Sequence, residues 1–88
     1  MKLIFSDGAW QDYRHWRNSD AKVFERLNAL IGEASRTPFN GTGKPEALKG
    51  DLSGWWSRRI TQTDRLLYRV SGSGRDQALE IAQCRYHY

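Results

Sequence analysis

Apolar residues change their spacing along this chain, from the period of a helix in the first half to the period of a strand in the second. Residues 21–36 carry them at helical intervals, at Val23, Leu27, Leu30, Ile31 and Ala34. Residues 65–71 alternate instead, with an apolar or aromatic side chain at every second position on one side. In a chain of 88 residues these two apolar faces must be buried against each other. We therefore expect residues 1–88 to form a single α+β domain.

Six elements are predicted, in the order β-α-α-β-β-β. They are a strand at 2–6, helices at 7–18 and 21–36, and strands at 55–61, 65–71 and 79–86. Ser6 or Asp7 can cap the first helix, and the turn at Ser19-Asp20 can cap the second. The second helix should end near Arg36-Thr37, because a residue that precedes proline avoids the helical conformation. This order predicts two helices on one face of an antiparallel sheet, with basic residues on the open face.

The segment from 38 to 54 is expected to be irregular, because it holds both prolines and four of the eight glycines. A short turn is expected around Glu46–Lys49. Gly41-Thr42-Gly43 is not followed by the Gly-Lys-Ser/Thr of a phosphate-binding loop, so nucleotide binding is not expected.

The charge of the chain is unevenly distributed. Residues 36–88 hold nine Lys/Arg and five Asp/Glu and supply the whole net charge of +4, which favours a polyanionic partner such as nucleic acid. No apolar run approaches the roughly 20 residues of a membrane span, and the apolar start is too short for a signal peptide. Cys84 is the only cysteine, which excludes a disulfide framework and a cysteine-based zinc site. These absences indicate the cytoplasm of a bacterium-like cell.

Arginines are predicted on the open face of the sheet. If Ile60 is in the core, Arg59 points away from the helices and meets Arg65 across the hairpin. Two adjacent guanidinium groups repel unless an anion lies between them, and their planar donors suit phosphate oxygens. The alternative is a pair of solvated arginines. Arg58 points toward the helices, where it either pairs with an acid or reaches the sheet edge.

The two adjacent tryptophans must face opposite sides of their strand. We expect Trp56 in the core. Trp55 either joins the core or is available to stack an RNA base.

Proton-transfer groups occur in the irregular segment and at the end of the last strand. RNA can be cleaved without a metal ion when its own 2′-OH attacks the adjacent phosphate, given a base, an acid and cations around the phosphate. Glu46, His87 and the pair Arg59 and Arg65 are groups of these types. Each is also common on a solvated surface, and neither composition nor alternation shows that they converge.

Five sequence blocks between residues 36 and 88 give a more specific signal. They are Arg36–Phe39 (RTPF), Gly43–Lys49 (GKPEALK), Leu52–Thr61 (LSGWWSRRIT), Arg65–Tyr68 (RLLY) and Cys84–Tyr88 (CRYHY). With these blocks in this order, the chain resembles the YoeB (Txe) toxins of the RelE/ParE superfamily of bacterial toxin–antitoxin systems. The resemblance implies the RelE-like fold of two helices on a twisted antiparallel sheet.

The resemblance also implies an endoribonuclease that cleaves mRNA in the ribosomal A site and inhibits translation. Carried over by position, Glu46 is the general base, His87 the general acid and Arg65 the group that stabilises the transition state. Tyr88 would orient the scissile nucleotide. The implied products are a 2′,3′-cyclic phosphate and a 5′-OH, and no metal ion or cofactor is expected.

Binding residues and partners follow from the same resemblance. Arg59 and Lys49 would bind phosphate, and we add Arg58 and Trp55 as candidate RNA contacts. A cognate antitoxin would cover the basic toxin with an acidic, partly disordered C-terminal tail, and a homodimer is plausible. Neutralisation could cover the site or displace the His87–Tyr88 end. The loop at Ser71–Ala78 departs from the family, being longer and richer in glycine.

Two other functions share parts of this pattern. A ParE-like toxin has this fold but poisons DNA gyrase by binding, and such toxins generally lack the acid–base set. A plain RNA-binding module needs a stacking platform and a basic groove but no proton-transfer groups. Substitution of His87 separates cleavage from binding alone.

Overall fold

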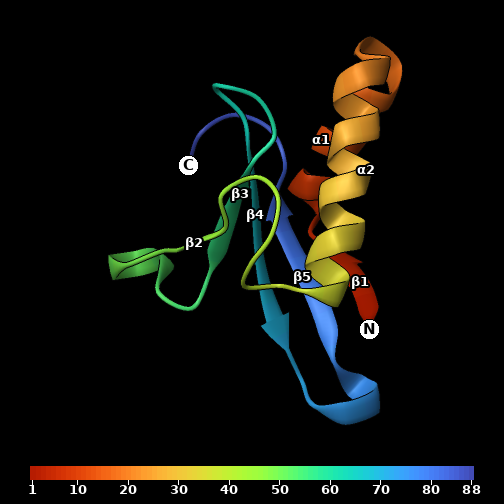
Figure 1. The fold of residues 1–88 in the computed structure, drawn as a ribbon. Helices are drawn as coiled ribbons and strands as arrows, with labels where there is room; N and C mark the ends of the chain where they lie inside the picture. Colours follow the sequence, from red (N-terminus) through yellow and green to blue (C-terminus); the bar gives the residue numbers. More distant parts are fainter.

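The computed structural model describes all 88 residues, which form a five-stranded mixed sheet with two helices packed against one face (Figure 1). The strands are β1 (Lys2–Phe5), β2 (Glu46–Ala47), β3 (Trp56–Arg59), β4 (Arg65–Ser71) and β5 (Ala78–Gln83). The helices are α1 (Asp7–Ser19) and α2 (Ala21–Arg36), and short 3-10 turns occupy Gly50–Leu52 and Gly74–Asp76. The predicted α+β class with two helices on one face of the sheet is confirmed.

Strand order in the sheet is β1-β5-β4-β3-β2, and it differs from the predicted antiparallel sheet at one pair. β1 runs parallel to β5, whereas the other neighbours are antiparallel. Most of the chain separates β1 from β5, so no tight turn determines their relative direction. Both strands run toward the start of α1, where the Ser6 hydroxyl donates to the Ala82 carbonyl at 3.0 Å. The sheet also gains the short strand β2, where the sequence predicts a turn.

Both helices begin at the predicted caps. The Ser6 hydroxyl accepts a hydrogen bond from the Ala9 N–H, and the Asp20 carboxylate accepts one from the Val23 N–H. These acceptors satisfy amides that have no partner within the first turn of a helix. α2 ends at Arg36, two residues before Pro38, as predicted.

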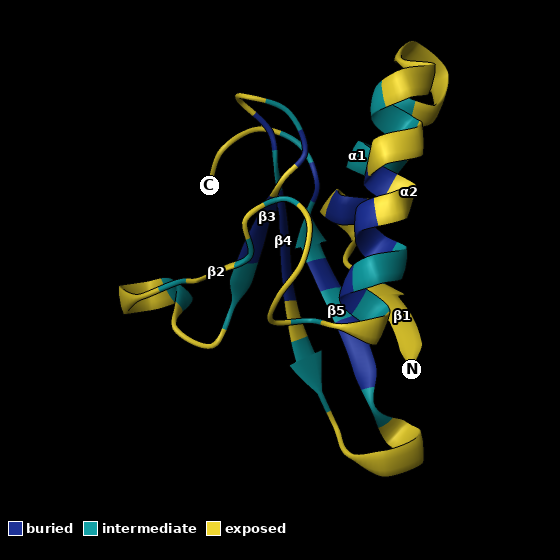
Figure 2. Cartoon of the chain, in the orientation of Figure 1, coloured by how far each residue is buried: buried dark blue, intermediate teal, exposed yellow.

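The core lies between the inner face of α2 and the central strands (Figure 2). Leu27, Leu30, Ile31 and Ala34 are the buried residues of α2. They belong to one cluster with Leu66 and Tyr68 of β4 and with Leu79 and Ile81 of β5. The helical spacing of the first half and the alternation of the second therefore meet in one interior, as the sequence predicts. Neither helix is long and apolar enough to cross a membrane.

Three strands end earlier than predicted. β1 ends at Phe5 instead of Ser6, β3 at Arg59 instead of Thr61, and β5 at Gln83 instead of Tyr86. Beyond β5, side chains of α1 hold the backbone of Cys84. The Asp12 carboxylate accepts the Cys84 N–H, and the Trp16 indole donates to the Cys84 carbonyl. Residues 85–88 are thereby directed away from the strand and toward the β3–β4 connection (Figure 1).

Candidate active site

Charged residues of three strands lie on the sheet face opposite the helices. Glu46 of β2 is directly opposite Ser57 of β3, and Arg59 of β3 is directly opposite Arg65 of β4. Residues that are directly opposite share a face, and so do residues two apart in one strand. Ser57 and Arg59 therefore place the predicted base beside the arginine pair, about 7 Å along the strand. The predicted meeting of Arg59 and Arg65 across the hairpin is confirmed.

The last residues of the chain return to this face. The Tyr88 hydroxyl donates to the Ser57 hydroxyl at 3.1 Å, and Ser57 is the residue paired with Glu46. The His87 ring stacks against the Tyr88 ring, with centroids 4.8 Å apart. His87 Nδ1 lies 3.0 Å from the backbone oxygen of Tyr88, and Nε2 has no hydrogen bond within the protein. The exposed imidazole thus has one ring nitrogen available to a substrate.

Arg65 is held in place by one half of its guanidinium group. Its Nη1 donates to the carbonyls of Thr61 at 2.9 Å, Asp64 at 3.0 Å and Gln62 at 3.3 Å. Its Nε and Nη2 make no hydrogen bond within the protein. A guanidinium held through one nitrogen presents its remaining donors in a defined direction, which suits a phosphate.

Arg59 and Lys49 are exposed, and neither side chain has a partner within the protein. Lys49 precedes the 3-10 turn between β2 and β3, and Arg59 lies at the end of β3. The face therefore carries cations that no carboxylate of the chain neutralises.

Arg58 lies on the other side of the sheet, and this corrects its assignment as an RNA contact. Its side chain is completely buried. The guanidinium donates to the Tyr68 hydroxyl and to the carbonyls of Thr37, Asn40 and Thr42, and it lies 3.6 Å from Glu33. The expected pairing with an acid near the helices is present. The Thr42 N–H and then the Arg58 charge hold the pKa of Glu33 below its usual value.

Trp55 faces the open side, whereas Trp56 packs against Phe39 beside the core. The Arg69 guanidinium stacks over the Trp55 ring at 4.5 Å, and Glu80 holds that guanidinium at 3.0 Å. The alternative left open by the sequence is thereby resolved: Trp55 lies outside the core, and one of its faces is covered by Arg69.

Asp64 and Ser57 are site residues that sequence reasoning missed. Asp64 is nearly buried, and it accepts hydrogen bonds from the Tyr86 N–H at 2.7 Å and the Thr61 hydroxyl at 2.6 Å. Burial alone would raise the pKa of Asp64, but these hydrogen bonds hold it below the usual value. Ser57 lies two residues before Arg59 and therefore on the same face of β3. This spacing could have identified Ser57 as a residue of the open face.

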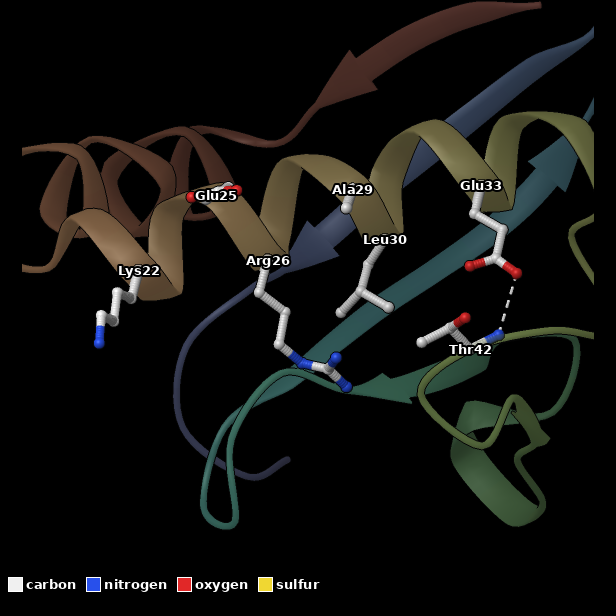
Figure 3. A pocket seen from close by; sticks show the side chains of 7 residues that line it. All are labelled: Lys22, Glu25, Arg26, Ala29, Leu30, Glu33 and Thr42. Atoms are coloured by element: carbon white, nitrogen blue, oxygen red, sulfur yellow. Dashed lines mark hydrogen bonds between the residues drawn. The ribbon is translucent and has the colours of Figure 1, made fainter.

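A shallow cavity of about 340 Å³ lies elsewhere, between α2 and the connection that carries Thr42 (Figure 3). Arg26 and Glu33 border it, and the Glu33 carboxylate accepts the Thr42 N–H at 3.0 Å. Arg26 also donates to the Ile60 and Arg59 carbonyls, so it supports the end of β3 from behind. None of the predicted site residues lines this cavity. The chain has no cluster of three or more His, Cys, Asp or Glu side chains that could hold a metal ion.

Known proteins are similar to this chain in sequence and in fold over nearly its full length. Residues 5–88 match the family model described as the YoeB-like toxin of bacterial type II toxin–antitoxin systems. Toxin YoeB of Streptomyces coelicolor is 53% identical over 88 residues, which is all of both chains. The structure of a YoeB/ParE toxin from Agrobacterium tumefaciens is 57% identical and superposes over the full length of both chains with a TM-score of 0.96.

The toxin of a heterotetrameric YoeB-YefM toxin–antitoxin complex from Staphylococcus aureus has a TM-score of 0.87 and 38% identity, covering all of this chain and 98% of that one. A family model that spans nearly the whole chain, together with full-length relatives above half identity, shows the family directly. This protein belongs to the YoeB toxins of bacterial type II toxin–antitoxin systems.

Proposed function

We propose that this toxin is a ribosome-dependent endoribonuclease that cleaves mRNA in the A site by acid–base catalysis. One observation carries the proposal: Glu46, the Arg59 and Arg65 pair and the His87–Tyr88 end come together on one open sheet face. A base, an acid and cations are the groups that cleavage by the 2′-OH requires. Their convergence is what composition and alternation left undecided.

In the proposed reaction, the Glu46 carboxylate takes the proton of a 2′-OH. The 2′ oxygen then attacks the adjacent phosphorus, and the bond from phosphorus to the 5′ oxygen breaks. His87 gives a proton to the departing 5′ oxygen, so that the products are a 2′,3′-cyclic phosphate and a 5′-OH. Arg65 places its free Nε and Nη2 donors toward the phosphate, where negative charge accumulates in the transition state.

Positioning of the substrate falls to the other residues of the open face. Tyr88, held to Ser57, would orient the scissile nucleotide. Arg59 and Lys49 would bind flanking phosphates, because both are exposed and unpaired. Trp55, already stacked by Arg69 on one side, would offer its remaining surface to a base.

A cognate antitoxin would occupy the same basic face through an acidic, partly disordered C-terminal tail. The net charge of +4 from residues 36–88 supports an acidic partner. The YoeB-YefM complex of the S. aureus relative supports an antitoxin as that partner. A structure of a YoeB dimer from S. aureus, whose chain is 38% identical to this one, supports a homodimer of the present toxin. The reaction would take place in the bacterial cytoplasm, where translating ribosomes are found.

The test is end mapping of an mRNA in a reconstituted bacterial translation reaction. The wild-type toxin should cut within the A-site codon and leave 5′-OH ends, and His87→Gln should not. His15→Gln is the matched control, because His15 is the other histidine and lies on α1, away from the site. Cleavage by His87→Gln at the wild-type rate would refute the role of His87. Failure of the folded wild type to cut would favour the gyrase-binding alternative, which a supercoiling assay would examine.

A further inference from the structure

The segment that carries His87 and Tyr88 has left the sheet before it reaches them. β5 ends at Gln83, and α1 holds the next residue, Cys84, through Asp12 and Trp16. Beyond that point the helices make no hydrogen bond to the chain. The location of His87 therefore depends on contacts made by the residues after Cys84, namely the Tyr88–Ser57 hydrogen bond on its far side and the contacts that precede it.

Tyr86 makes those contacts, and Asp64 is the central partner. The Tyr86 N–H donates to Asp64 Oδ1 at 2.7 Å, and the Tyr86 carbonyl accepts from the Arg65 N–H at 3.0 Å. The Gln83 amide group lies at 2.8 Å from the Arg85 carbonyl and 3.4 Å from the Tyr86 carbonyl. The hydrogen bond to the Asp64 carboxylate is the short, charge-assisted one of this set.

The backbone of Tyr86 shows why an anchor is needed there. Its φ angle is +65°, a left-handed conformation that residues with a side chain seldom adopt. Such a conformation persists only where surrounding contacts hold it. This turn redirects the chain so that the Tyr88 hydroxyl reaches Ser57 on β3.

Asp64 is itself rigidly held, and it directly precedes Arg65. Its second carboxylate oxygen accepts the Thr61 hydroxyl at 2.6 Å, and its carbonyl accepts the Ile60 and Thr61 N–H groups. The same carbonyl accepts from Arg65 Nη1. One residue therefore contacts both the Arg65 guanidinium, as one of its three carbonyl acceptors, and the turn that leads the chain into His87.

We propose that Asp64 is a positioning residue, whose carboxylate holds the turn at Tyr86 so that His87 and Tyr88 lie opposite Arg65. Asp64 touches neither the proposed substrate nor its reacting atoms. Its effect on cleavage rests on the proposed function, whereas its effect on the order of the chain end does not. Removing the anchor releases the last residues without unfolding the sheet, because Cys84 remains held by α1.

The first experiment measures backbone order by ¹⁵N relaxation of the full chain. In the wild type the amides of Tyr86 and His87 should have order parameters of about 0.85, and in Asp64→Ala they should fall below about 0.6. Asp64→Asn should keep the order, because its amide oxygen still accepts the Tyr86 N–H. Asp12→Ala is the matched control: it removes another carboxylate that accepts an N–H of this segment, yet it should leave His87 ordered.

The second experiment separates rate from binding in the translation reaction. At saturating ribosome concentration, Asp64→Ala should lower kcat by about 10- to 100-fold with little change in KM, because a small misplacement of a catalytic group has this effect. The kcat of Asp64→Asn should stay within about threefold of the wild-type value, and the kcat of Asp12→Ala should equal the wild-type value.

The two readouts keep the proposals distinct. An ordered His87 in Asp64→Ala, or a disordered one in the wild type, overturns the anchor whether or not the toxin cleaves RNA. A released His87 with unchanged kcat overturns the positioning role. If the wild type does not cleave at all, the proposed function fails, and the relaxation experiment still decides whether Asp64 is the anchor.

Discussion

Replacing Arg58 by alanine should destabilise the protein severely while leaving its open face intact. The side chain is fully buried and donates four hydrogen bonds, three of them to carbonyls of the connection after α2. A hydrogen bond from a charged donor contributes about 1.5–3 kcal/mol, so four set a ceiling of about 6–12 kcal/mol. Thr37, Asn40 and Thr42 are exposed, and their carbonyls regain water in the variant. About half of the ceiling then remains, a loss of about 3–6 kcal/mol.

Urea unfolding followed by tryptophan fluorescence measures this loss. It should appear as a lower midpoint at a similar slope, and as a fall in Tm of at least about 12 °C. If Arg58→Ala cannot be obtained as a folded protein, Arg58→Lys replaces it in this measurement. It keeps the charge but lacks the forked donors, and it should cost about 2 kcal/mol.

Arg59→Ala is the matched control, because the neighbouring arginine is exposed on the opposite face and has no partner. Its free energy of unfolding should stay within about 0.5 kcal/mol of the wild type. An Arg58→Ala protein that unfolds at the wild-type midpoint would refute the reasoning, and weakened RNA binding in such a stable variant would restore Arg58 as an RNA contact.

Three other predictions concern the open face. Glu46→Ala should reduce cleavage by about 10²–10⁴-fold without lowering stability, because Glu46 is exposed; near-wild-type cleavage rates would contradict its role as the base. Arg59→Gln or Lys49→Gln should weaken binding of a non-cleavable 2′-O-methyl RNA and make its logarithmic salt dependence shallower by about 0.7, and an unchanged slope would exclude phosphate contact. The pKa of Asp64 is lowered in the folded protein, so its contribution to stability is complete above about pH 4 and is lost as pH falls through that lowered value. Wild type should therefore lose more stability than Asp64→Asn between pH 5 and pH 2.5, and parallel pH profiles would show that Asp64 is not the group responsible.

Periodicity predicted the parts of the fold that depend on one local rule. The helical spacing of α2 and the alternation of β4 each follow from burial of one face, and both agree with the structure. The same alternation brought Arg59 opposite Arg65, because the short β3–β4 connection leaves little freedom of register. The family resemblance named Glu46 and His87 as partners, but only the return of the chain through Tyr86 explains how His87 can approach β2 and β3.

Other features depend on contacts between distant segments, which no local pattern encodes. Alternation points Arg58 toward the helices, but it does not show which groups surround the guanidinium there. Arg58 is buried because the 37–42 connection turns its carbonyls inward, and Gly41 makes this path possible with a φ of +117°. A side chain at that position would collide with the Glu33 carboxylate. The anchoring of Tyr86 by Asp64 likewise joins two loops that lie 22 residues apart.

The parallel pairing of β1 with β5 has a consequence for when the toxin becomes complete. Contacts at this pair join positions 76 residues apart, so the fold has a high contact order at its edge. Closing so long a loop costs entropy before the hydrogen bonds between β1 and β5 can stabilise the chain. This makes the pairing of the two strands a slow step. During synthesis β1, α1 and α2 are all made well before β5 exists. The segment that follows β5 carries His87, so a partly synthesised chain holds both helical segments before it holds the residue proposed as the acid.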